Sequence, residues 1–326
     1  MTSQVLYNGA TGGLGRHLSA ALAARQVPGR PIRSRLGDVT GLAEELDHLS
    51  IEPNSVLTFI QSAAMVSVPE CEQDPERAFD VNVTRTVATV ESFVEWTRDR
   101  GHAPNVVFVS SGHVYAPPPP GDRLTESAPT HPGSVYATTK LEGEERIRAL
   151  SHTHGVRVVV ARVFGLIGPD QPQHYLLPGL IRRARSGDVS AVPGLDYVRD
   201  YLDARDVSRL LVSLASTLST VGIAEDVFTV NVCSGEPTRI GDLLDLVLAI
   251  VHQGDPNSLQ RALLVVGPAP GRPSDIEWSV GDLTRLSQMI AEPIRAISVA
   301  DTIADALAAG AFAAPRSTEG PSVGQT

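Results

Sequence analysis

The sequence is poor in cysteine, in long apolar runs and in positive charge, and each shortage excludes a class of protein. Its two cysteines, Cys71 and Cys233, lie in different segments and lack the spacing of a metal site or a disulfide framework. No apolar run is long enough to cross a bilayer, and the N-terminus enters a strand pattern without a charged leader. We therefore expect a cytoplasmic protein with no metal and no membrane partner.

The charge balance excludes a general nucleic-acid binder. The formal net charge is -10 at pH 7, whereas proteins that bind nucleic acid need an excess of Lys and Arg to neutralise phosphates. Apolar residues at 42% and charged residues at 20% are ordinary globular values, so the chain should bury a sizeable core. Its 326 residues suit one large α/β domain with a substrate-binding lobe.

Apolar segments alternate with helical patterns along the first two thirds of the chain. Gln4–Asn8 is an apolar run that stops at glycines, and a Leu- and Ala-rich helical pattern follows it to about Arg25. Further strands are expected at Ser55–Gln61, Asn105–Ser110, Val156–Arg162 and Val227–Val232. Because helical stretches such as Pro75–Arg98 separate them, the pattern predicts an α/β fold with a doubly wound parallel sheet of the Rossmann type.

Beyond Gly168, Pro and Gly become frequent and the expected helices stand in irregular surroundings: Leu177–Ser186, Arg239–Val251 and Val299–Ala309. We expect these helices to form a smaller, mainly helical substrate-binding lobe. The lobe is assembled from two pieces of chain, because the strand at Val227 belongs to the parallel sheet. The predicted division is 1–168 and 200–235 for the dinucleotide-binding domain, 169–199 and 236–314 for the lobe, and 315–326 for a disordered tail.

Glycines gather at the first strand-to-helix junction. The segment Gly9–Gly15 reads Gly-Ala-Thr-Gly-Gly-Leu-Gly, and at such a junction backbone N–H groups and the helix dipole can hold a pyrophosphate. Glycines are needed there because side chains would block the approach of the ligand. A plain tight turn is the alternative, and the position at the first junction favours a dinucleotide site.

Tyr136 and Lys140 lie one turn apart on an expected helix. A neighbouring cation stabilises phenolate over phenol, so we expect Tyr136 to exchange a proton with a substrate oxygen near neutral pH. Ordinary surface helices also carry Tyr and Lys at this spacing. The context favours catalysis, because the strand at Asn105–Ser111 ends in two serines, 25 residues before Tyr136, and can place the Ser111 hydroxyl against a carbonyl oxygen.

These motifs together resemble those of the extended short-chain dehydrogenase/reductases, a family of nucleotide-sugar epimerases, dehydratases and reductases. The resemblance continues through most of the chain, at Asp38, Asp80–Val83, Arg162–Pro169, Arg199–Asp206, Asn231–Gly235 and Gly271–Asp275. It implies that Tyr136 is the acid/base, that Lys140 modifies its pKa and binds the cofactor ribose, and that Ser111 donates to the substrate oxygen. The cofactor would exchange a hydride with the carbon bearing that oxygen.

The resemblance also implies a set of cofactor-binding residues. Asp38 resembles the family's adenine-contacting Asp, and Asn82 resembles the Asn that supports the catalytic helix. The full set is Gly9, Thr11, Gly12, Gly13, Leu14, Gly15, Arg33, Arg35, Asp38, Val39, Ala63, Ala64, Asn82 and Lys140.

The choice between NAD(H) and NADP(H) depends on the end of the second strand. NAD-preferring relatives usually place an acid there, whereas Pro28–Arg35 contains none and leads over a short path to Asp38. Arg33 and Arg35 can pair with a 2′-phosphate, which favours NADP(H) over NAD(H). The alternative is a trimmed strand with two solvated arginines, which leaves NAD(H) open.

The residues after Ser111 bear on the reaction. Sugar 4,6-dehydratases of the family commonly carry a carboxylate there, whereas this chain has Gly112 and His113, so dehydration is disfavoured. His113 is either a proton carrier, since imidazole titrates near working pH, or a histidine held by a backbone carbonyl. Two further similarities favour carbonyl reduction: to dTDP-4-keto-6-deoxysugar reductases at Ala63–Phe79 and Lys140–Glu145, and to GDP-4-keto-6-deoxymannose reductases at Gly271–Asp275 and Val280–Asp282.

For a nucleotide-linked sugar, the resemblance points to Arg199 and Arg272 as the residues that neutralise the diphosphate. His113 and Asp275 complete the predicted substrate site. Loop arginines are often only solvated, so this expectation depends on family position. One departure counts against it: after Phe164 relatives usually carry Asn, and this chain has Gly165. A glycosylated or polyketide-type ketone therefore stays open as substrate.

The sequence thus supports three hypotheses. The first is an NAD(P)H-dependent ketoreductase acting on a nucleotide-linked keto-deoxysugar. The second is a nucleotide-sugar 4-epimerase with tightly bound NAD, which would use the same Ser, Tyr and Lys. The third is a non-catalytic dinucleotide-binding sensor, whose usual mark would be loss of Tyr136 or Lys140, and both are present. Relatives commonly form homodimers, so a homodimer is also possible.

Overall fold

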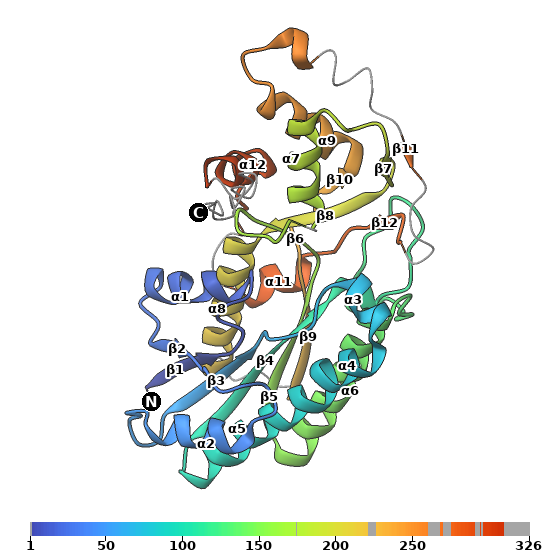
Figure 1. Cartoon of the computed structure of the whole chain (residues 1–326). Helices are drawn as coiled ribbons and strands as arrows, with labels where there is room; N and C mark the ends of the chain where they lie inside the picture. Colours follow the sequence, from blue (N-terminus) through green and yellow to red (C-terminus); the bar gives the residue numbers. More distant parts are fainter. Residues whose placement is uncertain are drawn as a thin grey trace, which may run out of the picture.

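The structure, a computed structural model, describes residues 2–173, 175–220, 226–259, 268–269, 275–290, 294 and 296–309. A parallel sheet with helices on both faces forms the larger part of the molecule, and a smaller lobe lies beyond one end of that sheet (Figure 1). Arg272 and the predicted tail at 315–326 lie outside the described residues.

The central sheet has six strands in the order β2-β1-β3-β4-β5-β9, and every neighbouring pair is parallel. The strands are β1 (Ser3–Tyr7), β2 (Gly29–Pro31), β3 (Val56–Gln61), β4 (Ala103–Ser111), β5 (Arg157–Val163) and β9 (Val227–Val232). The central strands β3, β4 and β5 are rich in Val, Ile and Phe that are buried on both sides, as helices over both faces require. The predicted Rossmann-type α/β fold is confirmed.

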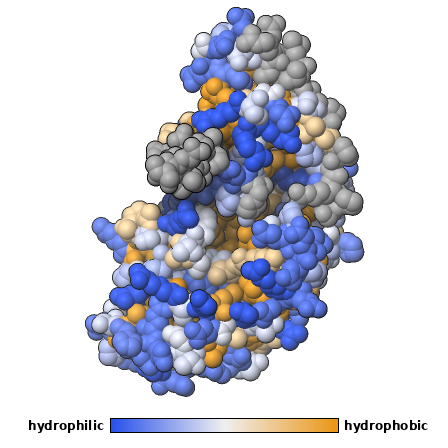
Figure 2. Space-filling model, viewed as in Figure 1, coloured by the Kyte–Doolittle hydropathy of each residue, from blue (hydrophilic) through white to orange (hydrophobic). Residues whose placement is uncertain are grey.

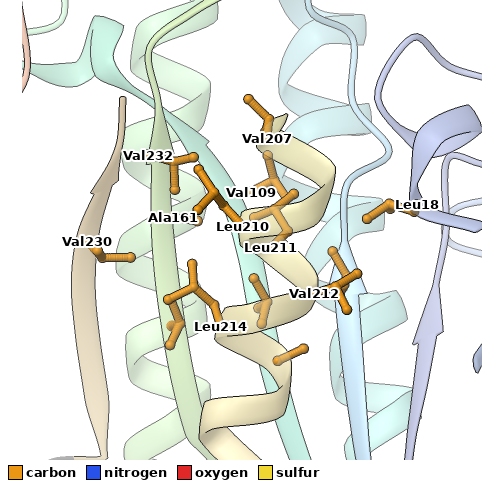
Figure 3. Close-up of a cluster of buried hydrophobic side chains, with 14 of the residues drawn as sticks. Leu18, Val109, Ala161, Val207, Leu210, Leu211, Val212, Leu214, Val230 and Val232 are labelled. Carbon is orange, nitrogen blue, oxygen red and sulfur yellow. The ribbon is translucent and has the colours of Figure 1, made fainter. Parts of the chain in front are cut away.

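Two helical layers cover this sheet. One face packs against α2 (Val39–Asp47), α5 (Thr86–Asp99) and α6 (Val135–His154). The other face packs against α1 (Gly15–Ala24), α8 (Ala204–Thr220) and the short α11 (Thr284–Met289). Figure 3 shows the apolar side chains of α8, among them Leu210, Leu211 and Leu214, packed against Val109, Ala161, Val230 and Val232 of the sheet. Each such fully buried side chain contributes roughly 1.5–3 kcal/mol of burial free energy.

The described part of the smaller lobe contains short strands and several helices. Its strands are β6 (Gly165–Ile167), β7 (Val192–Pro193), β8 (Val198–Asp203), β10 (Pro237–Arg239), β11 (Pro268–Ala269) and β12 (Trp278–Ser279). Its helices are α7 (Leu176–Ser186), α9 (Ile240–Val251) and α12 (Val299–Ala308), which share one apolar core. Three details differ from the predicted boundaries. The strand β6 precedes residue 168 yet pairs with β8, and β8 pairs with lobe strands beyond residue 200. The helix α11 packs against the central sheet.

The expected helix at Pro75–Arg98 is divided into three parts. The three parts are α4 (Pro75–Phe79), a π-helical turn, η1 (Asp80–Arg85), and α5. A separate short helix, α3 (Val68–Gln73), precedes them. Periodicity alone does not reveal such a turn, because it shifts the register by one residue inside a continuous helical pattern. A single turn, η2 (Gly112–Val114), follows β4. Among the described residues, no helix is long and apolar enough to span a membrane.

Candidate active site

The turn between β1 and α1 requires glycine for two different reasons. Gly9 has φ +72°, and a Cβ on Gly15 would lie 2.1 Å from the Gly9 carbonyl oxygen, so these two positions are closed to larger residues. A Cβ on Gly13 would meet no atom within 4 Å, so this position borders open space. No side chain caps α1, and its N-terminal N–H groups and dipole suit an anion. The turn therefore fits the pyrophosphate of a dinucleotide.

Asn8 holds the exit of β3 against this turn. Its Oδ1 accepts hydrogen bonds from the backbone N–H groups of Ser62 and Ala63, both at 2.8 Å, and its Nδ2 donates to Gln61 Oε1 at 2.6 Å. The Ser62 hydroxyl donates to the Asn8 carbonyl at 2.6 Å. These bonds place Ala63 and Ala64 beside the glycine turn. The sequence analysis missed Asn8, although a polar residue ending an apolar strand was a visible signal.

The loop after β2 carries the predicted adenosine-side residues. Asp38 caps α2, and its Oδ1 accepts from the Gly41 N–H at 2.9 Å. The side chains of Arg33 and Arg35 are exposed, and in the described part of the chain neither guanidinium has a carboxylate partner. The backbone N–H of Arg33 is instead taken by the Glu45 carboxylate at 2.9 Å. Arg33 and Arg35 thus present two exposed cations in the loop after β2.

Ser111, Tyr136 and Lys140 converge at the carboxyl end of β4. Ser111 is the last residue of that strand, and its Oγ accepts from the His113 N–H at 3.2 Å. Tyr136 and Lys140 occupy the first turns of α6, which Ser134 caps by accepting from the Ala137 N–H. A hydrogen bond with Ser111 acts on the Tyr136 phenol. The Lys140 ammonium is buried, with Nζ 5.1 Å from the Phe108 ring centroid.

The ionisation of these groups differs from the sequence expectation. Burial raises the pKa of Tyr136 to about 12, and the Ser111 hydrogen bond only partly opposes this. Ser111 is the group that lowers the pKa of the phenol, and the role of Lys140 as its pKa modifier stays a prediction. Burial lowers the pKa of Lys140 itself to about 8, against the opposing charge of Glu144. At pH 7 the phenol is therefore a proton donor beside a mostly charged ammonium.

His113 faces the same space as Ser111 and Tyr136. Its ring lies edge-on to Tyr136, with centroids 6.0 Å apart and an interplanar angle of 78°. The surrounding protein, and then the charge of Arg199, lower the pKa of His113 to about 4, while Asp275 opposes the shift. His113 is a solvent-exposed residue. Its two alternatives, a proton carrier or a structural histidine, both stay predictions.

Arg199 is the residue of the smaller lobe that lies near His113. It lies on β8, half-buried, and donates to the Val198 carbonyl at 2.9 Å while its guanidinium stands 5.5 Å from the Tyr197 ring. Burial lowers its pKa, and Asp275 acts on it in the opposite direction. The structure thus brings together three of the predicted substrate residues, His113, Arg199 and Asp275. The fourth, Arg272, lies outside the described residues.

Asn82 lies in the π-helical turn and joins three segments. Its Oδ1 accepts from the Met65 N–H at 2.7 Å, and its Nδ2 donates to the Met65 carbonyl and to Thr139 Oγ1, both at 2.9 Å. The side chain is 1% exposed, so these bonds have no competition from water. Thr139 belongs to α6 between Tyr136 and Lys140. Asn82 therefore ties the loop after β3 to the helix that carries both residues.

The departure at Gly165 has a steric cause. A Cβ there would lie 2.6 Å from the Asp200 carbonyl oxygen and 2.9 Å from the Tyr201 ring. Gly165 and Tyr201 are paired residues of β6 and β8, so the ring covers the glycine directly. The Tyr201 hydroxyl is buried and has no hydrogen-bond partner among the described residues. The aromatic side chain thus fills the volume that a side chain at position 165 would need.

A pocket of about 340 Å³ opens between the loop after β3 and the segment that precedes α7. Ala64, Met65, Glu70, Arg77 and Tyr175 are among the residues that line it. Tyr175 also acts electrostatically on Tyr136, so the pocket adjoins the catalytic candidates. On the face seen in Figure 2, apolar residues gather toward the middle of the molecule and hydrophilic ones surround them. Neither Ser111 nor Tyr136 lines this pocket, and Tyr175 is the lining residue that connects it with Tyr136.

Three comparisons place this arrangement among known proteins. The model of the NAD dependent epimerase/dehydratase family matches residues 5–232. GDP-6-deoxy-D-mannose reductase of Pseudomonas aeruginosa is 30% identical over 278 residues, covering 80% of this chain and 86% of that protein. dTDP-6-deoxy-L-talose 4-dehydrogenase (NAD(P)(+)) of Kitasatospora kifunensis is 25% identical over 305 residues, covering 86% and 88%. The structure of RMD from Pseudomonas aeruginosa complexed with NADPH superimposes with a TM-score of 0.76 and 26% identity, covering 94% and 98%.

Proposed function

Because the chain belongs to the NAD dependent epimerase/dehydratase family of NAD(P)-dependent enzymes, we propose that it reduces the keto group of a nucleotide-linked deoxysugar with NADPH. The observation that carries the proposal is the convergence of Ser111 and a protonated Tyr136 beside the pocket between the lobes. A phenol that keeps its proton at neutral pH suits the reducing direction, in which the substrate oxygen must gain a proton.

The composition of the chain independently supports a chemical role for Lys140. Of the 27 Lys and Arg residues in the chain, 26 are arginine, and Lys140 is the only lysine. Arginine is the cationic side chain at every other such position, so position 140 is one where arginine could not replace lysine. An ammonium is a compact point charge whose pKa responds to burial, whereas a guanidinium stays charged and needs more room. This supports a chemical role for Lys140 rather than a surface role.

The proposed mechanism assigns one task to each side chain. NADPH supplies the hydride when bound. The Ser111 hydroxyl donates a hydrogen bond to the carbonyl oxygen and orients the carbonyl carbon. As negative charge develops on that oxygen, Tyr136 transfers its phenolic proton to it, and the product alcohol forms. Lys140 holds the cofactor ribose and stabilises the phenolate that remains, because a nearby cation favours the charged form. Arg199 neutralises the diphosphate.

The preference for NADPH over NADH is part of the proposal. Three features support it: no acid ends β2, Arg33 and Arg35 have no carboxylate partner in the described chain, and the similar RMD structure is complexed with NADPH. Replacing both arginines with serine should raise the KM for NADPH about tenfold or more and leave the KM for NADH within twofold. Arg30→Ser, which removes an exposed cation from β2, is the matched control. Equal effects on both cofactors would contradict this preference.

The direct test is a turnover assay with NADPH and GDP- or dTDP-linked 4-keto-6-deoxysugars. A reductase oxidises one NADPH for each alcohol formed. A 4-epimerase would instead purify with bound NAD and interconvert nucleotide sugars with no net change in cofactor. Failure to oxidise NADPH with either class, or epimerisation without cofactor turnover, would reject the proposed reaction. The homodimer and the cytoplasmic location stay predictions, to be tested by light scattering and cell fractionation.

A further inference from the structure

A buried ionic cluster lies directly behind the proposed catalytic residues. The Glu144 carboxylate accepts from Ser110 Oγ at 2.5 Å, and Arg162 meets it with two bonds, Nε to Oε1 at 2.9 Å and Nη2 to Oε2 at 2.7 Å. Ser110, Glu144 and Arg162 are 2%, 1% and 5% exposed, so solvent screens none of these charges. Taking two charges out of water is costly, so a buried pair that is kept suggests a specific use. Breaking such a pair would leave an uncompensated charge in the interior.

The members of this cluster come from the elements that carry the active site. Ser110 precedes Ser111 on β4, and Arg162 is its directly paired neighbour on β5. Glu144 lies on α6 one turn after Lys140 and two turns after Tyr136. Side chains four residues apart on a helix share one face, and in the described chain the Glu144 charge acts on Lys140 without a direct ion pair between them. One carboxylate therefore connects the strand of Ser111 with the helix of the other two residues.

We propose that Glu144, clamped by Ser110 and Arg162, is a positioning residue that aligns α6 on β4 and keeps the only lysine of the chain in its charged form. The inference rests on the proposed function, because it assigns Lys140 the task of holding the cofactor ribose and stabilising the Tyr136 phenolate. Burial alone drives Lys140 toward the neutral amine, and the Glu144 charge opposes it. Arg162 in turn limits how much negative charge the lysine experiences.

Other ionisable groups near the cluster are accounted for as follows. The Cys71 thiol of α3 also acts on Lys140, and burial raises the pKa of this thiol to about 11, so it is neutral at pH 7. Tyr136 is neutral as well. Around Glu144 stand Arg162, the half-exposed Arg148 at 3.7 Å, and the buried Tyr115 phenol, over which Arg162 lies at 4.6 Å. Glu144 is thus the charged carboxylate that acts on Lys140, and two arginines modulate it.

The single lysine allows a direct test without any substrate. Isotopically labelled lysine incorporated into the protein gives one side-chain NMR signal, and its pH titration reports the Lys140 pKa. Glu144→Gln removes the negative charge and leaves Arg162 in place, so the proton affinity of Lys140 should fall about tenfold, one pKa unit. Arg162→Gln leaves Glu144 uncompensated, so the proton affinity should rise by a similar factor. Glu142→Gln, which breaks the exposed pair with Arg146 on the same helix, should change it less than twofold.

The opposite signs separate this role from a merely structural one. If the cluster only held the fold together, Glu144→Gln and Arg162→Gln would both loosen the site and hydrate Lys140. The Lys140 pKa would then rise in both variants. Arg148→Gln provides a variant that folds even if the buried ones do not, because its guanidinium is half-exposed. It should raise the proton affinity of Lys140 roughly twofold. An unchanged lysine titration in Arg148→Gln or in folded Glu144→Gln would overturn the proposal.

Activity provides the second readout. If the enzyme turns over, the alkaline limb of the kcat/KM profile should move with the lysine titration, downward in pH for Glu144→Gln and upward for Arg148→Gln. If no variant and no wild-type protein oxidises NADPH while the lysine titrations move as stated, the proposed reaction fails and the electrostatic role of Glu144 stands. If turnover is present while the lysine titration ignores Glu144, the reaction stands and the present inference fails.

Discussion

The two parts of the molecule hold their functional side chains in different ways. In the Rossmann part, Asn82 forms buried hydrogen bonds that cross from one element to the next, between Met65 and Thr139. In the lobe, Arg199 has a carbonyl and a ring as its neighbours, and the Tyr201 hydroxyl has no hydrogen-bond partner among the described residues. Chemistry therefore sits on a rigid framework, whereas substrate recognition depends on fewer contacts and can change more easily.

This comparison predicts its largest effect at Tyr136. Replacing Tyr136 with Phe removes the proton donor but almost no volume, so kcat should fall by about two or more orders of magnitude while the melting temperature stays unchanged. NADPH oxidation and thermal unfolding measure the two quantities. Tyr175→Phe removes a hydroxyl from the other phenol of the site and should lower kcat much less. Comparable losses in both variants would show that the cleft, rather than Tyr136, supplies the proton.

A substitution in the lobe should change KM rather than kcat. Replacing Arg199 with Gln removes a charged contact to the diphosphate, so KM for the nucleotide sugar should rise about tenfold to a hundredfold. The dissociation constant for NADPH should stay within twofold, since Arg199 belongs to β8 and not to the glycine turn. Arg239→Gln removes an exposed lobe cation and is the matched control. A fall in kcat with unchanged KM would contradict the division between the two parts.

Stability should respond strongly in the Rossmann part. Asn82→Ala leaves the buried Met65 N–H and carbonyl without their partner, and the free energy of unfolding should fall by about 1–3 kcal/mol. Urea denaturation measures this change. Thr84→Ala, at an exposed position of the same π-helical turn, should cost less than about 0.5 kcal/mol. If both variants lost the same free energy of unfolding, the π-helical turn as a whole, and not the Asn82 amide, would be the source of the stability.

The smallest effect is expected in the lobe and has the opposite sign. Tyr201→Phe removes a buried hydroxyl that has no hydrogen-bond partner among the described residues and keeps the ring that covers Gly165. The free energy of unfolding should rise by up to about 1 kcal/mol, because a buried polar group without a hydrogen bond is unfavourable. The same urea experiment measures it. A loss of stability would indicate that this hydroxyl does have a partner and that the lobe is held as tightly as the sheet.

Local sequence patterns were sufficient for the fold and for naming the candidate site residues. The strands at Ser55–Gln61 and Asn105–Ser110 were readable because both of their faces are apolar, and the glycine turn because only glycine suits its backbone. The spacing of Tyr136 and Lys140 is a property of one helix. One further signal lay in the composition, since a single lysine among 26 arginines already distinguished position 140.

Only the tertiary structure decided which states these residues adopt. Ionisation depends on burial, and burial is produced by elements far apart in sequence, which is why the Tyr136 phenol keeps its proton. Two adjacent serines received different partners, since Ser110 points to Glu144 while Ser111 meets Tyr136. The sequence by itself determined the architecture and the candidate groups, because both follow from short-range patterns. Their charges and contacts follow from packing across the whole chain.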